Sequence, residues 1–162
     1  MRIPSDNQWP RTPVIDTVKP ERLYVGKTNM IDITEDDGLT WEQGIPFPPP
    51  QYSSCCRLEF EALVATGQPG RLVLGVGFSE NDAVSFSSIG GGIYTSTEYG
   101  VTWNYVSVSQ VISPVISLAV DPRDLRTPLL VVAGEKDVLI SDDQLSRSTP
   151  SLAPASPPAC GC

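Results

Sequence analysis

Residues 34–41, with the sequence TEDDGLTW, decide how this chain is interpreted. They place a polar turn between an apolar strand and a tryptophan, and residues 96–103, with the sequence STEYGVTW, repeat the arrangement. An acid in the third place can accept backbone N–H bonds across a tight turn, and a glycine in the fifth place supplies positive φ. Each stretch therefore predicts the tip of a β-hairpin whose tryptophan packs on the apolar side.

The residues of this pattern are predicted to have a structural role. They are Thr34, Asp36, Gly38, Thr40 and Trp41 in the first copy and Ser96, Glu98, Gly100, Thr102 and Trp103 in the second. Because the second copy carries glutamate where the first carries aspartate, we expect its longer side chain to hold the turn less tightly. The sequence predicts no catalytic, cofactor-binding or metal-ligating residue, and no cofactor.

The pattern hydroxyl-x-Asp-x-Gly-x-Thr-Trp resembles the Asp-box, or BNR repeat, of sialidases, xyloglucan-degrading endoglucanases, sortilin-type receptors and photosystem II assembly factors. In those families the box caps the hairpin between the third and fourth strands of β-propeller blades. The resemblance therefore implies an all-β fold, a partial β-propeller of about two to three four-stranded antiparallel blades. A closed propeller takes about 4 to 8 blades of roughly 40 to 45 residues each, more than this chain supplies.

The chain divides into repeats and connecting segments. These are an irregular lead-in (1–13), a blade-like repeat (14–45), a Pro-rich connector (46–57), a second blade-like repeat (58–108), an incomplete third repeat (109–145) and a disordered tail (146–162). The third repeat follows the pattern through residues 141–143 and then loses it, since Leu145 stands where glycine is required. This break suggests a truncated or frame-shifted product, or a last strand supplied elsewhere.

Apolar alternation predicts the strands within the repeats. In the first repeat it favours a strand that starts at Val14, includes Val18 and ends at Lys19. In the second repeat it places Phe60, Ala62 and Val64 on one face of a strand, with Leu63 on the other. The glycines at 90–92 could cradle phosphate if a helix followed, but a strand follows instead.

Composition limits the partners. The chain has 11 basic and 19 acidic residues, a net charge of −8, which argues against a nucleic-acid or anionic membrane surface. It shows neither a signal peptide nor an apolar run of the ~20 residues that span a bilayer, so its localisation stays open. The absence of histidine removes the commonest metal ligand and general base.

The four cysteines stand as two close pairs, Cys55 with Cys56 and Cys160 with Cys162. Neighbouring cysteines bridge each other only with strain, so a disulfide would have to join the two pairs or two chains. Zinc binding is a further alternative, although the spacings differ from those of zinc fingers and ribbons. Free thiols are the preferred interpretation.

The favoured function is a non-catalytic binding or scaffold module for a carbohydrate or protein ligand. The assembly-factor type fits less well, because those proteins hold their partner with arginine-rich patches and this chain is acidic. Each blade buries its apolar face only against its neighbours, so a short run of blades leaves two open sides. We therefore expect self-association or completion by further blades.

The alternative is a fragment of an Asp-box glycoside hydrolase, sialidase-like or xyloglucanase-like. Such an enzyme needs two carboxylates roughly 5 to 9.5 Å apart, one of them held protonated. The candidate acids at strand ends or in loops are Asp16, Asp82 and Asp121, although single acids in loops more often form turns.

A sialidase would also require an arginine triad and a tyrosine nucleophile. Arg57, Arg71 and Tyr94 can be nominated, but no motif selects them. The segment Arg2-Ile3-Pro4 resembles the sialidase motif whose arginine grips the substrate carboxylate, yet polar residues follow it where that family has an apolar strand. We interpret this match as coincidence and transfer none of these roles.

Overall fold

A computed structural model describes residues 13–27, 30–46, 56–80, 88–106, 115–121, 130–134 and 138–141. Within these ranges the chain forms strands and turns without any helix, which confirms the predicted all-β fold with antiparallel sheets. The predicted lead-in before Pro13, the predicted tail and most of the Pro-rich connector lie outside the described residues.

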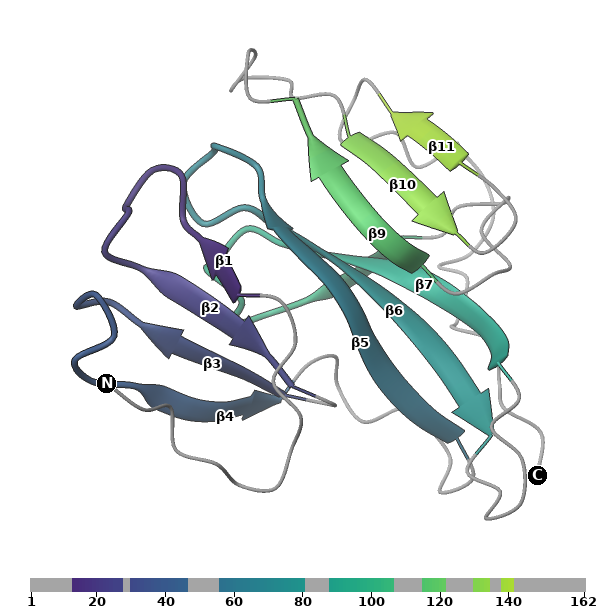
Figure 1. Cartoon of the computed structure of the whole chain (residues 1–162), viewed down its shortest axis with the longest axis horizontal. Helices are drawn as coiled ribbons and strands as arrows, with labels where there is room; N and C mark the ends of the chain where they lie inside the picture. Colours follow the sequence, from purple (N-terminus) through teal and green to yellow (C-terminus); the bar gives the residue numbers. More distant parts are fainter. Residues whose placement is uncertain are drawn as a thin grey trace.

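The described strands form three sheets, and consecutive strands pair antiparallel in each (Figure 1). The first sheet holds β1 (Pro13–Ile15), β2 (Leu23–Gly26), β3 (Met30–Thr34) and β4 (Glu42–Pro46) in that order. The second holds β5 (Cys56–Ala65), β6 (Leu72–Glu80), β7 (Ser88–Ser96) and β8 (Asn104–Val106). The third holds β9 (Val115–Val120), β10 (Leu130–Gly134) and β11 (Val138–Ser141), with β10 in the middle.

The second sheet lies between the other two, so both of its faces are covered. Along β6 the side chains alternate, and Leu72, Leu74 and Val76 join a buried cluster with Tyr24 and Ile31 of the first sheet. Val73, on the opposite face of β6, packs in a second cluster with Val115 and Leu118 of β9. The third sheet contacts the second through β9, which lies against β5, β6 and β7 (Figure 1). The near-continuous apolar run of β6 is what a strand buried on both faces requires.

One face assignment in β5 differs from the sequence-based prediction. Phe60 and Leu63 share the cluster toward the first sheet, whereas Ala62 and Val64 pack toward the third sheet. The pairing of β5 with β6 shifts register between Phe60 and Ala62, which leaves Glu61 as an extra residue. A bulge of this kind reverses the alternation for the rest of the strand.

Two glycines permit close approach between sheets. A Cβ at Gly26 would meet the ring of Phe60, which lies on β5 of the second sheet. A Cβ at Gly75 would lie 2.8 Å from Cβ of Val115 on β9. Any larger side chain at either position would push the facing sheets apart.

Candidate functional site

The first hairpin tip (residues 34–41) is held by two side chains. The Thr34 hydroxyl accepts the amides of Asp36 (3.3 Å) and Gly38 (2.9 Å) and donates to Asp36 Oδ1 (2.8 Å). Asp36 in turn accepts the Thr40 amide at Oδ1 (2.8 Å) and the Thr40 hydroxyl at Oδ2 (2.6 Å). The hydroxyl and the acid thus satisfy the backbone groups that the tight turn leaves without partners.

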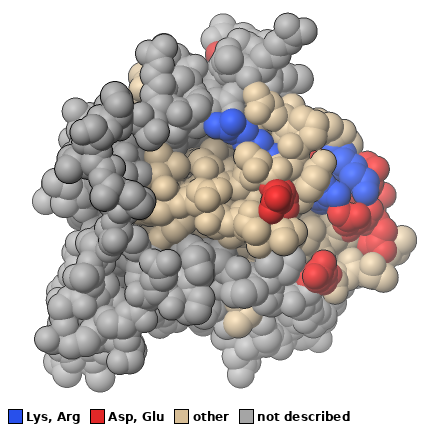
Figure 2. All heavy atoms as spheres, turned by 180° about the vertical axis from the view of Figure 1, so that it is seen from behind, with Lys and Arg blue, Asp and Glu red and all other residues tan. Residues whose placement is uncertain are grey.

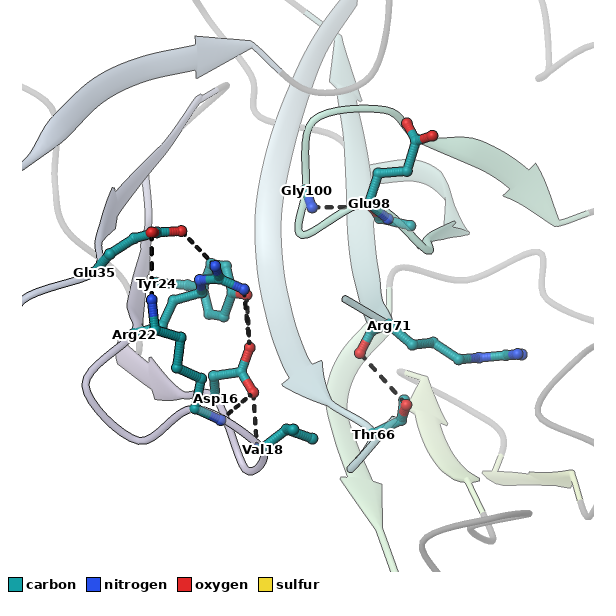
Figure 3. Close-up of polar contacts among 11 residues, drawn as sticks. Asp16, Val18, Arg22, Tyr24, Glu35, Thr66, Arg71, Glu98 and Gly100 are labelled. Atoms are coloured by element: carbon teal, nitrogen blue, oxygen red, sulfur yellow. Dashed lines mark hydrogen bonds and ion pairs between the residues drawn. The ribbon is translucent and has the colours of Figure 1, made fainter. Parts of the chain in front are cut away.

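The second hairpin tip (residues 96–103) repeats this arrangement with one difference. The Ser96 hydroxyl accepts the amides of Glu98 (3.1 Å) and Gly100 (2.9 Å), as Thr34 does in the first tip. Glu98 accepts the Thr102 hydroxyl at 2.7 Å. Figure 3 shows its carboxylate extended away from the turn. Glutamate therefore keeps the contact with the hydroxyl but adds no bond to the Thr102 amide.

Two consecutive residues in each tip have positive φ. They are Asp37 (55°) and Gly38 (79°) in the first, and Tyr99 (56°) and Gly100 (86°) in the second. The glycines follow the sequence-based prediction. The residues before them were not predicted, because aspartate and tyrosine carry no obligatory signal for this region of φ, ψ space.

The two tryptophans differ in depth. Trp103 is buried and belongs to the cluster between the first and second sheets. Trp41 is half-buried, and its indole N–H donates to the carbonyl of Gly38 at 3.0 Å. Trp103 has a sheet to pack against on its side of the hairpin, whereas Trp41 closes its own turn.

Each hairpin tip also bonds to the first turn of its own sheet, which connects the first and second strands. The amide of Asp37 donates to the carbonyl of Glu21 (3.0 Å), and the amide of Tyr99 donates to that of Gly70 (2.9 Å). In a meander the first and third turns lie at the same end of the sheet. In both sheets these bonds therefore join the first turn to the third.

A polar cluster lies at this end of the first sheet and joins Asp16, Arg22, Tyr24 and Glu35 (Figure 3). Asp16 is buried, accepts the amides of Val18 (2.9 Å) and Lys19 (3.1 Å) through Oδ1, and accepts the Tyr24 hydroxyl (3.0 Å) through Oδ2. The acid therefore turns the chain directly after Ile15. This is why β1 ends before the predicted position of Val18.

Arg22 connects this cluster to the second sheet. Its Nη2 bonds to Glu35, its Nη1 lies 3.8 Å from Asp16 Oδ2, and its guanidinium carbon lies 3.8 Å from the centroid of the Tyr99 ring. Tyr99 stands at the second hairpin tip, so a buried cation from one sheet stacks on an aromatic ring of the next. Such a contact is worth about 0.5–2 kcal/mol, more when it is desolvated.

The protonation equilibria follow from these contacts. The bonds from the Thr40 hydroxyl and amide, and then from Thr34, lower the pKa of Asp36 to about 2. The hydrogen bond from Arg22 lowers the pKa of Glu35. Burial, and then the charge of Asp16, raises the pKa of Tyr24 above its ordinary value of 10.0. At neutral pH Glu35 and Asp36 are therefore charged and the phenol of Tyr24 is neutral.

Charged side chains gather on the surface around the first hairpin tip. Lys19 Nζ lies 3.4 Å from Glu35 Oε2, while Arg22 pairs with the other oxygen of that carboxylate. Blue and red surfaces adjoin at the right of Figure 2, the side on which the first sheet lies after the rotation from Figure 1. Exposed pairs such as Lys19 with Glu35 contribute little to stability.

Of the acids and aromatic residues considered for catalysis, Asp16 and Tyr94 have structural contacts. Asp16 serves the turn described above, Asp121 follows the end of β9 and is half-buried, and Asp82 lies outside the described residues. Tyr94 is buried in the core, edge-on to Tyr105 with ring centroids 5.2 Å apart.

Of the arginines named for a sialidase site, Arg71 has a described side chain. In Figure 3 the side chain of Arg71 extends away from Arg22, and burial lowers its pKa. Arg57 lies on β5 and its side chain is outside the description, as is residue 2. The cysteines at 55, 160 and 162 are also outside it, and Cys56 is the first residue of β5.

A buried ion pair was missed by the sequence analysis. Lys27 Nζ lies 2.6 Å from Asp32 Oδ2, with 2% and 0% of the two side chains exposed. The alternating pattern of β3 marks position 32 as facing away from Ile31 and Ile33, but it does not reveal that this face is buried. Lys27 stands three residues before Met30, and no sequence signal pairs it with Asp32.

Within the described ranges, no three His, Cys, Asp or Glu residues are grouped so that they could hold a metal ion. A helix that is long and apolar enough to cross a membrane does not occur in those ranges either. The chain matches no protein-family model, and a search of curated proteins finds no similar sequence.

Proposed function

We propose that the three sheets are consecutive blades of an Asp-box β-propeller, and that the chain is a non-catalytic binding or scaffold module for a carbohydrate or protein ligand. The common meander order of the sheets supports the blade assignment, and so do the equivalent bonds at the two hairpin tips. The first strands also lie against one another, β1 against β5 and β5 against β9, as strands around a common axis would.

The observation that carries the non-catalytic role is the use of the acids in the turns. Asp36 is committed to Thr34 and Thr40, and Asp16 to backbone amides and Tyr24. A glycoside hydrolase needs one carboxyl group with a raised pKa as its acid. The pKa values of Asp36 and Glu35 are instead lowered. A tyrosine nucleophile would need an accessible phenol, whereas Tyr94, the nominated tyrosine, is buried in the core.

The second candidate is a fragment of an Asp-box glycoside hydrolase, sialidase-like or xyloglucanase-like. It is favoured by Asp121, which stands directly after β9, the strand of the third sheet that contacts β5, and is only half-buried. Strand ends of this kind are common positions for catalytic acids, because the strand fixes the backbone.

Both candidates are tested with purified chain on fluorogenic sialosides and xyloglucan oligosaccharides, with binding followed by isothermal titration. We expect binding of the oligosaccharide without hydrolysis, and equal behaviour of the Asp121→Asn variant. Turnover that is lost in Asp121→Asn while the melting curve stays unchanged would overturn the non-catalytic proposal in favour of the enzyme. If neither binding nor turnover is observed, a protein remains as the proposed ligand of the module.

A further inference from the structure

The first hairpin tip contains the one Asp-Gly pair in the sequence, Asp37-Gly38. An aspartate before glycine rearranges readily, because glycine has no side chain to hinder attack by its own amide nitrogen. In that reaction the nitrogen loses its proton and bonds to Cγ of the aspartate, and the carboxyl oxygen leaves as water. The succinimide ring that results then takes up water and opens at either carbonyl. One product is aspartate, and the other is isoaspartate, whose main chain runs through Cβ and Cγ.

The carboxyl group that would react is open to solvent. The side chain of Asp37 is exposed, and within the described residues it forms neither a hydrogen bond nor an ion pair. The preceding acid differs, since Asp36 is held by Thr34 and Thr40 and is not followed by glycine. Nothing in the folded tip therefore shields the carboxyl carbon of Asp37.

The amide that would attack this carbon is held by another bond. The N–H of Gly38 donates to Oγ1 of Thr34 at 2.9 Å, and both residues are buried. The peptide before it is fixed as well, because the amide of Asp37 donates to the carbonyl of Glu21 at 3.0 Å. The Gly38 nitrogen must leave Thr34 and lose its proton before a ring can close. Ring closure therefore requires local opening of the tip.

The second hairpin tip has the same protecting bond without the reactive carboxyl group. The N–H of Gly100 donates to Oγ of Ser96 at 2.9 Å. The residue before this glycine is Tyr99, whose φ of 56° matches the 55° of Asp37. Opening of the second tip consequently produces no isoaspartate, and the chain contains its own comparison for the first tip.

We propose that Asp37-Gly38 is a site of isoaspartate formation, and that the buried hydroxyl of Thr34 sets its rate by holding the Gly38 amide. The isoaspartyl product has an additional main-chain carbon between the two residues, which displaces this amide from Thr34. Rearrangement thus converts a transient opening of the first tip into a permanent one and leaves the second tip intact. The reaction consumes only the chain and water, so it is independent of the ligand of the proposed module.

Incubation of the whole chain in mildly acidic buffer, below its melting temperature, tests this proposal. Isoaspartate is quantified by enzymatic methyl transfer to its free carboxyl group and is located by tandem mass spectrometry. We expect slow formation at Asp37 in the wild-type chain. Formation should be at least about threefold faster in Thr34→Val, because loss of a hydrogen bond raises the population of the open tip. Thr34→Ser keeps the hydroxyl and should stay close to the wild-type rate.

Ser96→Val is the matched control, because it removes the equivalent hydroxyl from the second tip. It should leave the rate at Asp37 unchanged, and near-UV circular dichroism shows whether each variant is folded. The wild-type chain unfolded in guanidinium chloride supplies the unprotected rate without any substitution, and this rate should exceed that of the folded chain.

Three results would overturn the proposal. The first is an equal rate in the folded and unfolded wild-type chain, and the second is an equal rate in folded Thr34→Val and wild type. The third is an acceleration by Ser96→Val as large as that by Thr34→Val, which would assign the reaction to global unfolding. Oligosaccharide binding by the unmodified chain is measured separately, so failure of the proposed function would leave these rates unaffected.

Discussion

The acids in the third place of the two hairpin tips differ by one methylene, and this changes what they can reach. Asp36 accepts both the amide and the hydroxyl of Thr40, and also the hydroxyl of Thr34. Glu98 accepts the hydroxyl of Thr102. A short side chain places both of its oxygens close to the backbone, whereas a longer one must fix additional torsions to do so.

A substitution that restores aspartate should therefore stabilise the second hairpin tip. We expect Glu98→Asp to raise the free energy of unfolding by about 0.5–1 kcal/mol, since it adds a bond to the Thr102 amide at an exposed site. The reverse change, Asp36→Glu, should lower it by a similar amount. Urea unfolding measures both, and a loss of stability in Glu98→Asp would contradict the role given to the acid.

Acid should weaken the first hairpin tip through Asp36. Its pKa falls from an ordinary 3.8 to about 2 in the folded chain, so the charged form is favoured by folding. The stability that it contributes is thus fully present above about pH 4 and is lost as pH falls through about 2. Asp36→Asn should flatten the pH dependence of unfolding in this window.

Asp37→Asn is the matched control for this experiment. Asp37 directly follows Asp36 and is exposed. It has positive φ, which asparagine also adopts. Its side chain makes none of the bonds that Asp36 makes to Thr34 and Thr40. If Asp37→Asn flattens the pH dependence as much as Asp36→Asn does, the assignment to Asp36 is wrong.

For single residues, the sequence predicted the backbone conformation of the hairpin tips but not the contacts that these residues make with other sheets. The spacing of Gly38 and Gly100 indicated positive φ, which both have, because that signal is local. The depth of Trp103 compared with Trp41 depends on whether another sheet packs against the hairpin. The contacts of Arg22 with Tyr99 join residues far apart in the chain, so no local pattern could reveal them.

Among the elements, β5 shows where alternation fails. A period of two assigns faces correctly only while every residue has a partner, and the extra Glu61 breaks that condition between Phe60 and Ala62. The sequence of β5 has no glycine or proline that would mark a bulge. In contrast, turn residues and the polar hairpin tip delimit β2 and β3.

The stacking of Arg22 on Tyr99 should couple the first and second sheets. In a double-mutant cycle of Arg22→Met and Tyr99→Leu, we expect a coupling free energy of about 0.5–2 kcal/mol from urea unfolding, because the cation is largely desolvated. Tyr99→Phe keeps the aromatic ring and should retain most of the coupling. Coupling near zero, or equal loss with phenylalanine and leucine, would contradict a cation–π contact between the sheets.

For the whole molecule, stability depends on the second sheet being covered on both faces. Its cluster with the first sheet includes Phe60 and Leu74, and its cluster with the third includes Val73 and Ile93. Each sheet alone would expose one of these clusters to water. The three sheets are therefore expected to unfold cooperatively, with the weakest protection from hydrogen exchange in the third, which has a neighbour on only one described face.

The packing of the third sheet can be tested at Gly75. A methyl group there would lie 2.8 Å from Cβ of Val115, so Gly75→Ala should cost about 1–3 kcal/mol of unfolding free energy through overpacking. Val115→Ala alone should also destabilise, because it leaves a cavity under β9. In the double variant Cγ1 of Val115, which would lie even closer to the new methyl than Cβ does, is absent, so the loss should be smaller than the sum of the two by at least about 1 kcal/mol. Additive losses would mean that β9 does not pack on β6 at this position, and the order of the three sheets would then be wrong.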